Sequence, residues 1–491
     1  MLSNIRVTHS GLINLVTGLS RVATAFIFIT FVTRSLSADE FGQYNLVLSM
    51  IAYVVMSHWF VSYWVTREIA RGNSTGKTAI LSSGIFPPVG FLIFLLIGIS
   101  LDSNFELSMI ALAGVLVPLQ FLHSVLNNIS IGWKPEAASY GNFLLEVTRV
   151  PLGFLFLLLL DMKLNGVFLS LIISYLVSII VMLCYNRNQF LTSFSTSVFK
   201  NWLSRFWIPG YPALIAIISK LDFLIVTLLS SSTVVGFYAA AFAIGSLVSY
   251  ANLVAVGVYP KLLGNDRGKY LSENFRLLIY FSIFFTAICV VFANQGLFVL
   301  NPMYQAVSIS VIFISIHFLL FNIYNSFNSM LKATETIDKK QNPTVMEFIK
   351  SKLFKLPTIQ LVQNVAYVLT LTVVLITVKF SSTVDMVNIW SAIYLITQIP
   401  STLFLSYWIR KEKLISFNSI AVSKYLFAII PTCIAVDFLN KTFLDYTDVF
   451  ILIPQLVLIL VISVLSYVAI TFLIDVHTKK FVKALLALLI K

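Results

Sequence analysis

The sequence predicts an all-α polytopic membrane protein with about 14 transmembrane helices. Of its 491 residues, 58% are hydrophobic and only 11% are charged, and the mean hydropathy is +0.93. A soluble chain of this length needs far more polar surface. Apolar runs of about 20 residues, enough to cross a bilayer as a helix, recur from end to end. A transmembrane β-barrel would instead show strands of about ten residues that alternate polar and apolar positions.

The candidate spans follow one another with short connections, which favours antiparallel neighbours. The first is predicted to be a span rather than a cleavable signal peptide, because it is long and many further spans follow it. The fourteen segments are 10–33, 43–66, 79–100, 105–127, 141–160, 164–185, 207–230, 236–260, 275–294, 304–325, 357–378, 384–409, 421–440 and 449–474.

The basic residues between the spans predict the orientation of the chain. If the N-terminus is cytoplasmic, 26 of the 33 Lys and Arg residues lie in cytoplasmic segments or at the cytoplasmic ends of spans, four lie in outer segments and three lie well inside spans. This asymmetry is the positive-inside pattern, so both termini are predicted to be cytoplasmic. The net charge of +13 is therefore attributed to a membrane face with anionic lipids, and no nucleic-acid partner is expected.

A weak internal repeat indicates two related bundles. FGQY at 41–44 opens the second span, and VGFY at 235–238 opens the eighth. The cytoplasmic position of 186–206 after six spans favours two parallel six-helix bundles, with two additional C-terminal helices and a central cavity. The alternative is that the shared pattern is only a helix-start motif. The predicted domains are 1–206, 207–420 and 421–491.

Five charged residues fall well inside predicted spans, away from the span ends. A central charge costs about 2.5–3.5 kcal/mol on insertion scales, so these side chains must meet one another, protein or water. We expect three of them to form a cationic, water-filled substrate site between the bundles, with two carboxylates as charge partners or ion-coupling groups. Two alternatives stay open: a self-neutralised pair of Glu146 and Arg149, which are three residues apart on one helix face, and clamps between helices. The predicted cations are Arg21, Arg149 and Lys220, and the carboxylates are Glu146 and Asp222.

Prolines within two spans are candidate hinges. GIFPPVG at 84–90 and WIPGYP at 207–212 interrupt apolar runs, and a broken helix at membrane depth is tolerated only beside protein or a cavity. Tyr140, Tyr211, Trp59 and Trp64 could stack on sugar rings, although membrane-interface belts explain such residues equally well. The hinge prolines are Pro87, Pro88, Pro209 and Pro212.

Other chemistry finds no support in the sequence. The cysteines and histidines lack metal-ligand spacing, and no HExxH, P-loop or GxSxG occurs, so no metal, cofactor or enzymatic machinery is expected. Two basic, amphipathic segments, 344–356 and 479–491, are predicted to lie on the inner membrane surface.

Three stretches carry a resemblance to a known family. RSLSADEFGQY at 34–44, TREIARG at 66–72 and VGFY at 235–238, together with the fourteen-span pattern, resemble polysaccharide transporters of the Wzx type, the O-antigen flippases. That family belongs to the superfamily that also holds multidrug-and-toxin extruders.

The resemblance implies a flippase rather than an enzyme. It would move undecaprenyl-pyrophosphate-linked oligosaccharides of O-antigen, lipopolysaccharide or a related polysaccharide across a bacterial plasma (inner) membrane by alternating access. A polysaccharide polymerase and a chain-length regulator are the further partners it implies. The rival readings are a cation-coupled multidrug extruder and a membrane-embedded polysaccharide polymerase or ligase. The first would favour an acidic cavity, and the second would need a larger outer loop.

Overall fold

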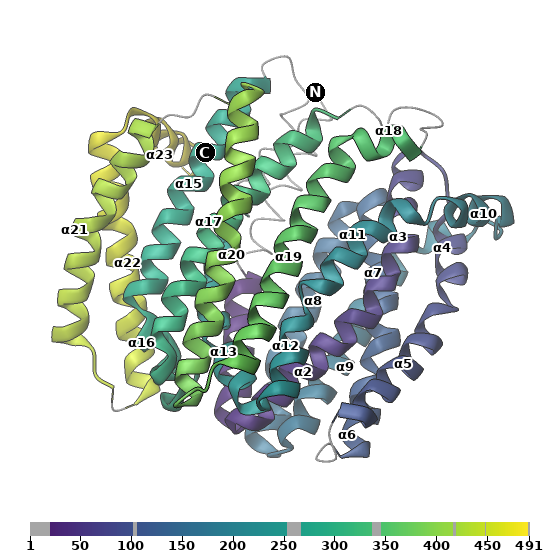
Figure 1. The fold of residues 1–491 in the computed structure, drawn as a ribbon, viewed down its shortest axis with the longest axis horizontal. Coiled ribbons are helices and arrows are strands. Elements are labelled where there is room, and N and C mark those ends of the chain that lie inside the picture. Colours follow the sequence, from purple (N-terminus) through teal and green to yellow (C-terminus); the bar gives the residue numbers. More distant parts are fainter. Residues whose placement is uncertain are drawn as a thin grey trace. The chain divides into compact units, whose positions relative to one another are not determined.

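The computed structural model of the chain describes residues 20–101, 106–252, 267–335, 345–415, 419–446 and 448–489. Every regular element in these ranges is helical (Figure 1). Thirteen of the described helices are long and apolar enough to cross a membrane, and they coincide with the second to fourteenth predicted spans. The helix at 20–35 is the described part of the first. The predicted all-α polytopic class is confirmed.

The chain divides by contacts into two compact units. Unit 1 holds residues 1–239 and 360–383, and unit 2 holds residues 240–359 and 384–491. The domain boundaries predicted from the sequence, 1–206, 207–420 and 421–491, divide the chain by span order rather than by contact, and they stay a prediction.

Unit 1 contains the helix at 20–35 and the first half of the labelled helices. Three spans are built from two helices joined by a short irregular step, at 84–85, 115 and 219–220. The elements are α2 (Ala38–Val55), η1 (Met56–His58), α3 (Trp59–Ala70), α4 (Gly76–Ser83), α5 (Phe86–Leu101), α6 (Leu107–Gly114), α7 (Leu116–Trp133), α8 (Pro135–Gly153), η2 (Phe154–Leu159), α9 (Lys163–Asn186), η3 (Arg187–Phe190), α10 (Thr196–Ser204), α11 (Trp207–Ile218), α12 (Leu221–Leu229) and the start of α13 (Ser232–Gly245).

Serine hydroxyl groups donate hydrogen bonds to backbone carbonyls inside unit 1. Ser178 of α9 donates to the carbonyl of Gly141 on α8 over 2.7 Å. Ser170 and Ser174 donate to carbonyls one turn earlier in α9. These bonds let polar residues lie in an apolar span without an unmet donor.

The motif at 34–44 has a local physical basis. Ser37 and Glu40 form a capping box that opens α2: the Ser37 hydroxyl accepts from the Glu40 amide, and the Glu40 carboxylate accepts from the Ser37 amide over 2.8 Å. This arrangement satisfies amides that the first helical turn leaves free.

The two glycines of FGQY and VGFY face each other. A Cβ on Gly42 would lie 1.8 Å from the Ser232 carbonyl oxygen, and a Cβ on Gly236 would lie 2.1 Å from the Ala38 carbonyl oxygen. Asp39 also accepts hydrogen bonds from the hydroxyls of Ser232 and Thr233. The repeat motif therefore marks a backbone-to-backbone crossing of α2 and α13, which only glycine permits at these positions.

Unit 2 contains the remaining elements, and α19 passes from unit 2 into unit 1. They are the end of α13, η4 (Ser246–Tyr250), α15 (Arg267–Val291), α16 (Ala293–Leu300), η6 (Pro302–Val307), α17 (Ser308–Ala333), α18 (Val345–Lys350), α19 (Lys352–Thr377), α20 (Thr383–Lys411), α21 (Ser419–Phe443), α22 (Val449–Ile474) and α23 (Val476–Leu489).

Tyrosines in stacked and edge-on contact form part of the core of unit 2. The ring centroids of Tyr280 and Tyr467 are 4.8 Å apart and those of Tyr280 and Tyr425 are 5.1 Å apart, joining α15, α21 and α22. Asn322 of α17 is fully buried and donates to the Val248 carbonyl over 2.9 Å. Its amide thereby ties α17 to η4.

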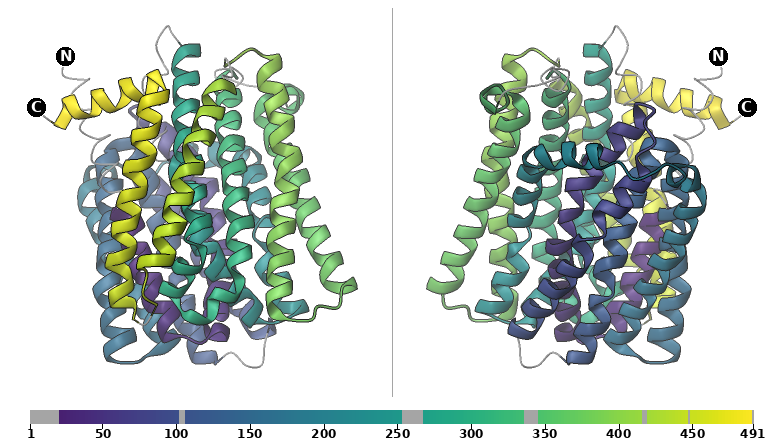
Figure 2. Two further views of the ribbon diagram at one scale, coloured as in Figure 1. Left: turned by 90° about the vertical axis from the view of Figure 1, so that its left-hand side faces the viewer. Right: turned by 90° about the vertical axis from the view of Figure 1, so that its right-hand side faces the viewer.

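The two segments predicted to lie on the membrane surface differ in structure. The tail forms α23, which turns away from the axis of α22 (Figure 2), and residues 490–491 lie outside the described residues. Its location on the membrane surface stays a prediction. The segment 344–356 does not form one surface helix: α18 ends at Lys350, and Leu353 and Leu356 belong to the spanning helix α19. The apolar stripe that suggested a single helix is divided at Ser351, whose hydroxyl donates to the Phe348 carbonyl over 2.6 Å.

Candidate functional site

The structure brings three of the five predicted charges together in unit 1. Glu146 of α8 lies between two guanidinium groups, with Arg149 Nη2 at 2.5 Å and Arg21 Nε at 3.8 Å. The side chain of Arg149 is 16% exposed and that of Glu146 is 11% exposed, whereas that of Arg21 is 50% exposed. Because two cations share one carboxylate, the cluster keeps one excess positive charge.

The helix at 20–35 is held beside α8 by aromatic packing. The Arg149 guanidinium lies 5.0 Å from the centroid of the Phe28 ring, a cation–π contact. A Cβ on Gly153 would lie 2.9 Å from that same ring. Arg21 lies beside Glu146 and Phe28 lies beside Gly153, so residue numbers rise together along the two helices. The helices therefore run in the same direction, as expected of the first and fifth spans.

Arg149 retains hydrogen-bonding capacity. Its Nε is buried and has no hydrogen-bond partner among the described residues. The contact of Glu146 Oε2 is with Nη2, at 2.5 Å. An anion with several acceptor oxygens could accept from this donor, because a guanidinium presents five donors in a planar fork.

Lys220 and Asp222 lie at a break in their span. The helix α11 ends at Ile218, and α12 begins at Leu221. The Tyr53 hydroxyl donates to the Lys220 carbonyl at this break. The Lys220 side chain is exposed, and no ion pair joins it to a described carboxylate.

Asp222 is buried and satisfied within unit 1. Its side chain accepts from the Tyr367 hydroxyl over 2.8 Å and from the Phe223 amide over 2.9 Å, and the residue is 4% exposed. Asn364, one turn before Tyr367 on α19, donates to the Ile215 carbonyl over 3.0 Å. Tyr367 and Asn364 could not be identified from the sequence, because nothing in their spacing reveals which helix faces the break.

Of the five predicted site residues, three form a cluster in the structure. Arg21, Glu146 and Arg149 are in contact, and Lys220 makes no hydrogen bond or ion pair with any of them among the described side chains. A single cavity that collects all three cations stays a prediction.

The prolines lie beside helix breaks or inside a regular helix. Pro87 and Pro88 occupy the first turn of α5, directly after the interruption at 84–85, where a missing amide costs little. The helix α11 continues through Pro209 and Pro212, and its interruption comes later, at 219–220. Their role as hinges stays a prediction.

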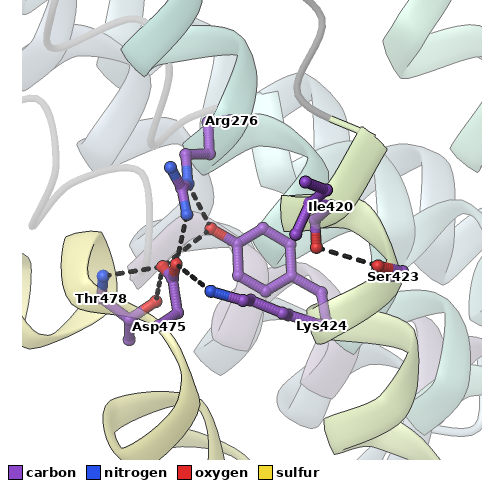
Figure 3. A network of polar contacts seen from close by, with 7 residues as sticks. Arg276, Ile420, Ser423, Lys424, Asp475 and Thr478 are labelled. Atoms are coloured by element: carbon purple, nitrogen blue, oxygen red, sulfur yellow. Dashed lines mark hydrogen bonds and ion pairs between the residues drawn. The ribbon is translucent and has the colours of Figure 1, made fainter.

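A second ionic cluster, in unit 2, joins residues far apart in the sequence and was not predicted from it (Figure 3). Asp475, at the end of α22, accepts from Arg276 of α15 and from the Thr478 amide and hydroxyl of α23 over 3.0 Å. Tyr425 and Lys424 of α21 complete it. Burial raises the pKa of Asp475, but the hydrogen bonds from Thr478 and the charge of Arg276 outweigh burial and hold that pKa below its usual range. The cluster joins four helices and is satisfied internally, which indicates a structural role.

Comparison with solved structures identifies the fold as that of MATE-type membrane transporters. An inward-facing multidrug resistance MATE family transporter of the MOP superfamily aligns with a TM-score of 0.58 and 13% identity, covering 82% of this chain and 99% of its own. A Vibrio cholerae MATE transporter, VcmN, aligns with a TM-score of 0.54 and 14% identity, covering 83% of this chain and 97% of its own. The lipid II flippase MurJ in an inward closed conformation aligns with a TM-score of 0.52 and 14% identity, covering 96% of this chain and 98% of its own.

The sequence itself defines the family. Residues 8–263 match the family described as "Polysaccharide biosynthesis protein". No curated protein matches the chain significantly. The chain belongs to this polysaccharide biosynthesis family, as the resemblance in its N-terminal motifs predicted, and it is a multi-pass membrane protein with a transporter fold.

Proposed function

We propose that the protein is a flippase that moves undecaprenyl-pyrophosphate-linked oligosaccharides, of O-antigen or a related surface polysaccharide, from the inner to the outer leaflet of a bacterial plasma membrane. The observation that carries the proposal is the Arg21–Glu146–Arg149 cluster, which places an excess positive charge within the spans of a polysaccharide biosynthesis family member. A pyrophosphate is the part of such a substrate that a cationic site would bind.

The likeness to a lipid II flippase supports this substrate class at the level of the fold. In the proposed mechanism the pyrophosphate and sugars enter the site while the polyprenyl tail stays in lipid. Arg149 meets the phosphates first, using its free Nε donor, and Arg21 and Lys220 bind them further along the path. Alternating access then exposes the site to the other side.

Charge reversal tests the proposal in a strain that lacks the gene. Arg21→Glu, Arg149→Glu and Lys220→Glu should each prevent assembly of the surface polysaccharide while protein levels in the membrane stay normal, because reversing a charge that meets a buried phosphate costs about 2–5 kcal/mol. Lys200→Glu, on the exposed face of α10, is the matched control and should complement. Full complementation by all three variants would show that these three residues do not form the substrate site.

A cation-coupled multidrug extruder is the second candidate. The MATE-like fold and the buried carboxylate of Asp222 at a helix break favour it. A drug-susceptibility panel separates the two functions: an extruder predicts increased susceptibility in the deletion strain that Asp222→Asn fails to restore, whereas a flippase predicts loss of polysaccharide with unchanged susceptibility.

A further inference from the structure

A groove of about 730 Å³ opens in unit 2 where α19 begins and α20 ends. Lys355 lies in the first turn of α19 and Lys411 is the last residue of α20. Since the two spans run in opposite directions, both ammonium groups lie at the same membrane surface. By the distribution of basic residues this is the surface predicted to face the cytoplasm.

The two lysines supply the net charge of the groove. Both are exposed, and neither forms an ion pair with a described carboxylate. Glu412 also lines the groove, but its two oxygens are already engaged: Oε2 lies 2.5 Å from Lys352 Nζ, and Oε1 accepts from the Trp408 indole over 2.8 Å. The carboxylate of Glu412 is thus neutralised in place, and two positive charges remain.

Below the lysines the groove is apolar and aromatic. Tyr407 is one turn before Lys411, about 6 Å along the helix, and Phe404 is about 10 Å along it. Tyr407 is 66% exposed and Phe404 is 52% exposed, and Ile359 lines the facing side on α19. An exposed aromatic ring below a cation is the arrangement found at the headgroup level of membrane proteins.

We propose that this groove binds one anionic glycerophospholipid of the surrounding leaflet. Its phosphate would lie between Lys355 and Lys411, and its acyl chains would lie against Phe404, Tyr407 and Ile359. Charge complementarity selects an anionic headgroup, and a free phosphate ion would leave the apolar floor of the groove uncovered. The inference does not depend on the transported substrate.

Native mass spectrometry of the full-length protein in detergent tests the proposal, with phosphatidylglycerol and phosphatidylcholine of identical acyl chains as probes. The wild type should bind phosphatidylglycerol more tightly than phosphatidylcholine. Each lysine near an anionic headgroup is worth about fivefold in affinity, so Lys355→Glu/Lys411→Glu should weaken phosphatidylglycerol binding by at least roughly 30-fold. The control Arg187→Glu/Lys200→Glu makes the same charge change on exposed residues of unit 1 and should leave binding unchanged.

Three results would overturn the proposal: equal binding of the two lipids by the wild type, equal loss in both double variants, or displacement of phosphatidylglycerol by a polyprenyl pyrophosphate at equal concentration. The last result would make the groove part of a substrate path. Inorganic phosphate should not compete. If the double variant does not fold, Lys355→Gln and Lys411→Gln singly should each weaken binding by about fivefold.

Discussion

Glu146 decides the charge balance of α8. It is a largely buried carboxylate between two guanidinium groups, so removing it leaves Arg149 without a counter-ion in an apolar surrounding. Arg149→Gln should destabilise the protein less, because Glu146 then still has Arg21 as an ion-pair partner. The asymmetry follows from the number of partners that each group has.

Glu146→Gln should lower the free energy of unfolding of the purified protein by about 3 kcal/mol or more, the cost of stranding a buried charge. Glu146→Gln/Arg149→Gln should be more stable than the single Glu146→Gln variant, since the stranded charge is gone. Thermal unfolding followed by fluorescence in detergent measures both.

The control for this comparison is the exposed Asp437–Lys441 pair of α21, whose atoms are 2.6 Å apart. Exposed pairs contribute about 0–1 kcal/mol, so Asp437→Asn should change little. A Glu146→Gln variant as mild as Asp437→Asn would show that Arg149 reaches water.

At the scale of helices, the packing of unit 1 depends on a close helix crossing and on breaks within spans. The capping box of Ser37 and Glu40 fixes where α2 begins, which in turn sets the height of Gly42 against α13. The breaks at 84–85 and 219–220 divide two spans into shorter helices. A backbone carbonyl beside the second break is met by Asn364, so the break is compatible with an apolar environment.

Gly42→Ala and Gly236→Ala should each destabilise the crossing of α2 and α13. The added Cβ would meet backbone oxygens, at 1.8 Å and 2.1 Å respectively, and backbone cannot move aside as a side chain can. A loss of about 1–3 kcal/mol or more is expected, seen as less folded protein by size-exclusion chromatography. Gly210→Ala, whose Cβ would meet only aromatic side chains, the nearest being Phe60 at 3.2 Å, should be tolerated. Wild-type yields for the first two variants would contradict the crossing.

At the scale of the whole molecule, the membrane orientation follows from loop charge. The prediction that both termini are cytoplasmic can be tested with reporter fusions. Alkaline phosphatase fused after Asp445, in the connection between α21 and α22, should be active, because that connection is predicted to lie outside. The same reporter fused after Lys480 should be inactive, and a fluorescent protein fused there should be bright. The opposite pattern at both positions would invert the topology and move the lipid groove to the outer surface.

The sequence by itself determined the class, the family and thirteen of the described spans, because hydropathy and loop charge are local properties that do not depend on which helices touch. It also identified Glu146 and Arg149 as partners, since residues three apart share a helix face. Only the tertiary structure decided that Arg21 joins them, that Asp222 is satisfied by Tyr367, and that Arg276 meets Asp475 across 199 residues. Side chains that meet across helices depend on the rotation and height of each helix, and packing sets both.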